Sequence, residues 1–202
     1  MARTASKTYR IGVLTSGHGR GSNLKAMHEY FKENGLPVEI SLVVITQNDS
    51  PVKALCQELD LYWELIPVIN MPLFEERLNT LKRELNLDLI ALAGFMRLLS
   101  QDFITGVGIP ILNIHPALLP RFGGKGMYGM RVHEAVFSSS ESVSGASIHI
   151  VDPIYDHGKI TMQESVDISK CKSPFDIAAA VLQVEHRIYA PAIYNYLTLI
   201  NT

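Results

Sequence analysis

Residues 9–24 read YRIGVLTSGHGRGSNL, and this stretch sets the expected fold. Its first part, Tyr9–Thr15, is a short apolar run typical of a buried strand. Residues 16–23 contain three glycines, and apolar residues then recur at helical spacing over residues 22–34. A strand that enters a helix through a glycine-rich turn is typical of the first unit of a parallel α/β sheet.

The same alternation of strand and helix continues along the chain. Further strands are predicted at 38–46, 62–67, 87–93 and 109–115, with helices at 51–59, 72–85 and 100–107. After residue 140 the pattern changes to two strands expected to pair antiparallel, 143–151 and 159–166, and a closing helix from 175 to about 196, which Pro191 is expected to kink or end. We therefore predict an open, mostly parallel, twisted sheet with helices on both faces, a Rossmann-like α/β fold with an antiparallel C-terminal part.

Length and composition restrict the class of protein. The chain has 202 residues, 47% of them hydrophobic, which suits one domain spanning 1–202. Its formal net charge of −2 argues against a general nucleic-acid binder. A polar start and the lack of any run of about 18 apolar residues predict a cytoplasmic protein without a membrane span. Cys56 and Cys171 lie far apart and are expected to be free thiols.

The glycine-rich turn suits a phosphate group. Glycines let the backbone approach a ligand closely, and the start of the next helix offers free N–H groups and a partial positive charge. The turn lacks the lysine of a P-loop, and its G-x-G-x-G spacing differs from the dinucleotide fingerprint. Asp49 leaves a dinucleotide open, and a tight turn with Ser22 as helix N-cap and no ligand is the other alternative. We favour a monophosphate held by Gly21, Ser22 and Asn23.

Two polar side chains interrupt the apolar strand at 109–115. Asn113 and His115 are two residues apart, so they lie on the same face of the strand and at its C-terminal end. Open α/β sheets bind ligands outside that end. An amide can stabilise an oxyanion and an imidazole can transfer protons, so the pair suits catalysis. A buried pair satisfied by neighbouring backbone fits the spacing equally well.

A turn at 152–158 adds carboxylates. Asp152 and Asp156 follow a strand that carries His149, and a carboxylate near His115 would favour the imidazolium. The alternatives are an ordinary Asp-rich turn and a metal site, the latter without supporting histidine or cysteine spacing. We expect no metal.

Five segments, read together, carry a resemblance to a known family. They are SGHGRGSNL (16–24), LAGFMRL (92–98), NIHPALLP (113–120), SIHIVDPIYDHG (147–158) and VEHRIYAP (184–191). In this order, over nearly the whole chain, they resemble the glycinamide ribonucleotide formyltransferases, folate-dependent enzymes of purine synthesis. The resemblance implies a formyltransferase-type domain whose N-terminal half binds the ribonucleotide and whose C-terminal half binds the folate.

The resemblance also implies roles for particular residues. Asn113, His115 and Asp156 match the family's catalytic trio. The acceptor's phosphate would lie on Gly21, Ser22 and Asn23, and its ribose against Glu185. The implied folate-binding set comprises Met96, Arg97, Leu98, Asn113, Ile150, Val151 and Asp156.

The implied reaction moves the formyl group of 10-formyltetrahydrofolate, a cosubstrate, to the amine of glycinamide ribonucleotide. The amine attacks directly, and Asn113 and protonated His115 stabilise the tetrahedral oxyanion while Asp156 keeps the imidazole charged. The resemblance implies neither a metal nor a covalent enzyme intermediate. Formyltetrahydrofolate deformylase, which shares the trio, and a non-catalytic phosphometabolite-binding module are the alternatives, and a homodimer is left open.

Three stretches depart from the family's pattern. The glycine turn is longer by His18, Gly19 and Arg20. Residues 121–132 are longer and richer in glycine, and we interpret them as a mobile loop near the site. Residues 70–76 lack the arginine that would meet the folate's glutamate tail.

Overall fold

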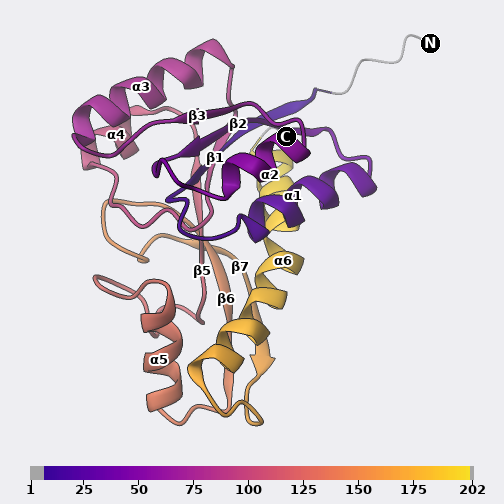
Figure 1. Cartoon of the computed structure of the whole chain (residues 1–202), viewed down its shortest axis with the longest axis vertical. Coiled ribbons are helices and arrows are strands. Elements are labelled where there is room, and N and C mark those ends of the chain that lie inside the picture. The colour runs from indigo at the N-terminus through magenta and orange to yellow at the C-terminus, as the bar shows by residue number, and fades with distance from the viewer. Residues whose placement is uncertain (1–6, 201–202) are drawn as a thin grey trace.

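The computed structural model describes residues 7–200 and contains, in that range, seven strands and six helices (Figure 1). The strands are β1 (Tyr9–Thr15), β2 (Val38–Ile45), β3 (Trp63–Leu65), β4 (Leu89–Leu92), β5 (Ile111–His115), β6 (Val143–Ile150) and β7 (Ile160–Asp167). The helices are α1 (Ser22–Glu33), α2 (Val52–Glu58), α3 (Met71–Glu84), α4 (Gln101–Gly106), α5 (Met130–Ser138) and α6 (Pro174–Leu199).

All seven strands form one sheet in the order β3-β2-β1-β4-β5-β6-β7. The first five are parallel, and β6 and β7 are each antiparallel to the preceding neighbour. Helices cover both faces. One face carries a core that includes Leu24 of α1 and Val181 of α6, and the other a core that includes Phe74 of α3 and Phe103 of α4. The predicted fold class is confirmed.

The sheet order places a binding crevice between β1 and β4. From β1 the chain builds outward to β3, then returns to add β4 and β5 on the other side. The loops that follow β1 and β4 therefore diverge at the C-terminal edge, which is where open α/β sheets bind ligands. Ser16 ties the two loops together, because its backbone N–H and its hydroxyl both donate to the Gly94 carbonyl, at 3.0 and 2.6 Å.

Helix α6 does not end at Pro191 but continues to Leu199, because Ile188 and Ile193 on either side of the proline are buried in the core. Helix α5 was not predicted. The N-cap of α1 is Gly21, in a left-handed conformation, so the alternative that named Ser22 as the N-cap is wrong on this point.

No helix within 7–200 has the length and apolar character needed to cross a membrane. Cys56 is buried, Cys171 is half-buried, and both are free.

Candidate functional site

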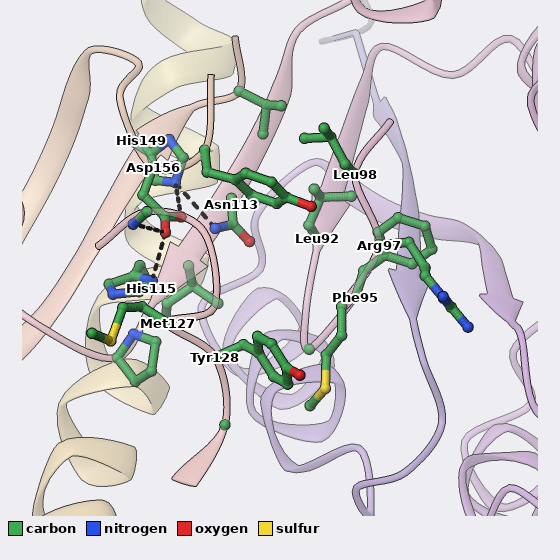
Figure 2. A pocket seen from close by; sticks show the side chains of 18 of the residues that line it. Leu92, Phe95, Arg97, Leu98, Asn113, His115, Met127, Tyr128, His149 and Asp156 are labelled. Carbon is green, nitrogen blue, oxygen red and sulfur yellow. Dashed lines mark hydrogen bonds and ion pairs between the residues drawn. The ribbon is translucent and has the colours of Figure 1, made fainter. Parts of the chain in front are cut away.

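A cavity of about 550 Å³ opens at the C-terminal edge of the sheet (Figure 2). Its volume is in the range of small-molecule sites. Its walls come from the loop after β4, the ends of β5 and β6, the turn at 152–156, the segment 124–131, and single residues of α1 and α6. Sequence-distant segments therefore converge on one space.

His115 is nearly buried at the end of β5, with 3% of its surface exposed. Its Nε2 lies 2.8 Å from the Phe122 carbonyl, and its Nδ1 lies 3.5 Å from Asp156 Oδ2. Because both neighbours are acceptors, only the doubly protonated ring can donate to both. Burial nevertheless lowers the pKa of His115 below its ordinary value, although the Asp156 charge and the Phe122 carbonyl oppose this.

Asp156 lies between two histidines. Its Oδ2 accepts a hydrogen bond of 2.9 Å from the Gly124 N–H, and its Oδ1 lies 3.5 Å from Nε2 of His149. Burial works against the carboxylate, but His149, His115 and the Gly124 N–H together hold the pKa of Asp156 below its usual range. Asp156 also has a φ of 53°, a left-handed conformation that is uncommon outside glycine.

Asn113 is fixed by His149. The two residues are paired across β5 and β6, and Asn113 Nδ2 lies 3.0 Å from His149 Nε2. His149 Nδ1 lies 3.1 Å from the Ile150 carbonyl, which can only accept, so in the neutral ring Nδ1 carries the proton and Nε2 accepts from Asn113. This uses one amide proton of Asn113 and leaves the other available at the cavity wall.

The segment 121–129 bonds to His115 and Asp156 through its backbone. It supplies the Phe122 carbonyl to His115 and the Gly124 N–H to Asp156. Between them, Gly123 has no room for a side chain, because an added Cβ would lie 2.5 Å from Leu119 Cδ2 and 3.1 Å from Asp156 Cβ. This glycine is needed for close approach.

The start of α1 provides a second set of polar groups. Gly21 has a φ of 76° and no side chain caps the helix, so the first-turn N–H groups and the positive end of the helix have no side-chain acceptor. Asn23 Nδ2 donates to Glu185 Oε2 at 2.6 Å, while Asn23 Oδ1 is buried without a partner among the described residues. Burial raises the pKa of Glu185 to about 7, and the Asn23 hydrogen bond opposes the rise.

Most of the predicted site residues meet at this cavity. The lining includes all three members of the proposed trio, both Asn23 and Glu185, and the folate candidates Met96, Arg97, Leu98 and Val151. Gly21 and Ser22 directly precede Asn23 but do not line the cavity, and neither does Ile150.

Some groups of the cavity were given no role by sequence reasoning. His149 was noted as one polar residue in an apolar strand, but its contacts with Asn113 and Asp156 were not predicted. The backbone groups of Phe122 and Gly124 left no signal in the residue types. Within 7–200 no cluster of three or more histidine, cysteine or acidic residues could hold a metal ion.

Comparisons with known proteins agree with this geometry. Residues 9–193 match the family model described as formyl transferase. The chain is 30% identical over 198 residues to a phosphoribosylglycinamide formyltransferase from Bacillus subtilis, covering 95% of this chain and 96% of that protein. It is 32% identical over 200 residues to the chloroplastic phosphoribosylglycinamide formyltransferase of Vigna unguiculata, covering 95% of this chain and 62% of the relative.

Solved structures show the same likeness. A phosphoribosylglycinamide formyltransferase from Anaplasma phagocytophilum superposes with a TM-score of 0.85 and 31% identity, covering 95% of this chain and 88% of that one. A glycinamide ribonucleotide transformylase from Symbiobacterium toebii gives a TM-score of 0.87 and 27% identity, covering 98% and 92%.

The coverage differs among the relatives. The chain spans about three fifths of the length of the plant relatives from Vigna unguiculata and Arabidopsis thaliana, at 62% and 64%. The family model nevertheless covers nearly the whole chain, from the first strand to the closing helix. The chain belongs to the formyl transferase family.

Proposed function

We propose that this chain transfers the formyl group of 10-formyltetrahydrofolate to the amine of glycinamide ribonucleotide. The observation that carries the proposal is the cluster of Asn113, His115 and Asp156 on one wall of the cavity, in a chain of this family. The relatives from Vigna unguiculata and Bacillus subtilis are both named as phosphoribosylglycinamide formyltransferases. A formyl transfer needs an oxyanion donor and a proton carrier side by side, and this cluster contains both.

The two substrates would meet in the cavity, with the acceptor reaching out of it past Asn23 to the start of α1. The phosphate of the acceptor would bind at the start of α1, on the backbone of Gly21, Ser22 and Asn23, with Glu185 against the ribose. The reduced folate would bind between the loop after β4 and the turn at 152–156. The half-exposed apolar side chains of Met96 and Leu98, 43% and 40% exposed, suit an aromatic pterin there. The remaining members of the proposed folate site are Arg97, Asn113, Ile150, Val151 and Asp156.

In the first step, the neutral amine of the acceptor attacks the formyl carbon. A carbon–nitrogen bond forms, and the carbonyl oxygen becomes an oxyanion. The free amide proton of Asn113 and the imidazolium of His115 stabilise this charge. Asp156 keeps the ring oriented and opposes the loss of its proton, because it lies 3.5 Å from Nδ1.

In the second step, the bond from the formyl carbon to the folate nitrogen breaks. His115 donates a proton to that leaving nitrogen, and the proton released by the new ammonium group restores the imidazolium. Because burial lowers the pKa of His115, the imidazolium is a stronger acid than an ordinary histidine, which favours this donation. The protein's residues hold and move the proton, and no covalent enzyme intermediate forms.

An absorbance assay for loss of the 10-formyl group, run with and without glycinamide ribonucleotide, tests the proposal. We expect loss only with the acceptor, matched by an equal amount of formylated product. Loss without the acceptor would identify a deformylase. Folded protein that causes no loss in either reaction would contradict the proposal and favour a binding module.

A further inference from the structure

Three positively charged side chains line the cavity without a charged partner. Arg97, Lys125 and Arg131 have no ion pair or hydrogen bond to any residue between 7 and 200. The acids of the same cavity are bonded to neighbours, as Asp156 is to Gly124. The wall therefore has unmatched positive charge, which suits an anionic part of a ligand.

Arg131 is the best organised of these three cations. It lies in the first turn of α5, and its guanidinium carbon is 4.9 Å from the centre of the Tyr128 ring. This cation–π contact places the side chain without using its N–H donors. The planar fork of a guanidinium matches the two oxygens of a carboxylate, so the held Arg131 is prepared to bind one.

The Tyr128–Arg131 unit adjoins the wall assigned to the folate. Gly129, between the two residues, faces Met96, because a Cβ added at Gly129 would lie at van der Waals distance, 3.7 Å, from the Met96 Cε atom. Figure 2 shows the Tyr128 ring extending into the cavity from the segment that also carries Met127. Tyr128 therefore offers an aromatic face, 45% of its surface being exposed, directly beside a cation.

A reduced folate has complementary chemistry at its far end. Beyond the pterin it carries a benzoyl ring and then a glutamate with two carboxylates. The ring would stack against Tyr128, and a carboxylate would take the fork of Arg131. The phosphate of the acceptor has its own donors at the start of α1, so it leaves Arg131 free for the folate.

We propose that Arg131, positioned by Tyr128, binds the glutamate carboxylate of the folate cosubstrate and sets the preference for glutamylated folates. Lys125, on the same segment, adds a second positive charge for a tail of more than one glutamate. The inference rests on the proposed function and adds a residue that determines its specificity.

Equilibrium binding of tetrahydrofolate and of the primary amide of tetrahydropteroate, which lacks the glutamate and any other carboxylate, tests the assignment by titration calorimetry. We expect Arg131→Ala to weaken tetrahydrofolate binding about three- to tenfold, as for a partly exposed ion pair with added hydrogen bonds. The amide should bind both proteins equally. Tyr128→Leu should also weaken tetrahydrofolate binding, but by less. Arg83 is an exposed arginine of α3 outside the cavity, so Arg83→Ala should leave the binding of both ligands unchanged.

Steady-state kinetics separates the two anionic substrates. Arg131→Ala should raise KM for 10-formyltetrahydrofolate and leave KM for glycinamide ribonucleotide and kcat near the wild-type values. Equal weakening of both folates, or a rise in KM for the acceptor instead, would overturn the assignment. Failure of the wild type to bind folate or to transfer formyl would instead refute the proposed function.

Discussion

The proposed catalytic end of the cavity and the start of α1 beside it are built from different groups. The proposed catalytic end, at β5 and β6, consists of buried side chains that bond to one another and to the backbone of 122–124. The start of α1 offers mainly backbone N–H groups, and the Asn23–Glu185 pair joins it to the cavity. Side-chain networks place protons, whereas backbone groups hold a charged group in position. Changes at the first end should therefore lower kcat, and changes at the second should raise KM for the acceptor.

Replacement of His115 should give the largest effect and tests the first half of this comparison. His115→Ala removes the proton carrier and one oxyanion donor, so kcat should fall by about 10²- to 10⁴-fold. Both KM values should stay within about threefold, because binding groups are unchanged. His157→Ala is the matched control, since His157 is an exposed histidine bonded to Asp152 on the same turn. Equal losses in kcat and in substrate affinity would count against the assigned role.

Gly123→Ala tests whether the backbone of 122–124 fixes the catalytic pair. The new Cβ would lie 2.5 Å from Leu119 Cδ2 and 3.1 Å from Asp156 Cβ, so the Leu119 side chain must move and Asp156 must shift by a few tenths of an ångström. A misplacement of this kind should lower kcat by about 10- to 100-fold and overpacking should lower the free energy of unfolding by about 1–3 kcal/mol.

Gly19→Ala serves as the control for Gly123→Ala, because an added Cβ at Gly19 has open space around it. Enzyme kinetics and urea denaturation would be measured on both variants. Wild-type kcat in Gly123→Ala would show that the contacts of Phe122 and Gly124 do not matter for catalysis.

Glu185 should make stability depend on pH at the other end of the cavity. Its pKa is raised to about 7 in the folded protein, against about 4.3 in an unfolded chain. The folded protein favours the protonated carboxyl group of Glu185. The contribution of this group to the free energy of unfolding is therefore fully present below about pH 4 and is lost as the pH rises towards 7. Glu185→Gln removes this dependence. The difference in free energy of unfolding between Glu185→Gln and the wild type should therefore shift by about 2 kcal/mol in favour of the variant from pH 5 to pH 8.

Urea denaturation at both pH values measures the effect of Glu185→Gln. Glu76→Gln, on the exposed side of α3, is the control. A stability difference between Glu185→Gln and the wild type that stays constant from pH 5 to 8 would show that Glu185 does not carry the effect.

Gly21→Ala should give the smallest effect and tests the backbone end. Gly21 has a φ of 76°, which strains a residue with a Cβ, and the added Cβ would lie 2.8 Å from Leu55 Cδ2, so the Leu55 side chain must also move. KM for glycinamide ribonucleotide should rise about tenfold, the strain being about 1–2 kcal/mol, while kcat changes less than threefold. A fall in kcat with an unchanged KM for glycinamide ribonucleotide would contradict the proposal that the start of α1 serves binding rather than the chemical step.

The parallel part of the fold was predictable from the sequence because its strands are buried on both faces. Runs such as Tyr9–Thr15 and Val38–Ile45 are mostly apolar, with Arg10 and Glu39 exposed near their starts, and each is followed by a helical stripe. The Asn113–His115 pair was visible for the same reason, as polar residues where the strand otherwise carries only apolar ones. Buried polar residues stand out because they cost stability unless they are bonded.

The remaining features depend on contacts that residue types do not encode. Helix α5 has only nine residues and follows a glycine-rich stretch. Its N-cap is Gly129, so no capping side chain marks where the helix begins. The bonds from Phe122 and Gly124 use backbone groups that every residue possesses. The pKa of His115 also depends on burial. Asp156 raises this pKa, as expected, but the burial that lowers it becomes evident only when the sheet is assembled.

The most direct test of the account is the chemical step itself, measured by single turnover in the wild type and in Asp156→Asn with both substrates saturating. The account predicts a fall of at least about 100-fold in the rate of formyl transfer, with the affinity for both substrates within about threefold. The pKa of His115, followed by NMR, should fall further in the variant, because the charge that raises it is gone. Formyl transfer at the wild-type rate in Asp156→Asn would contradict the assignment of this cluster as the catalytic centre.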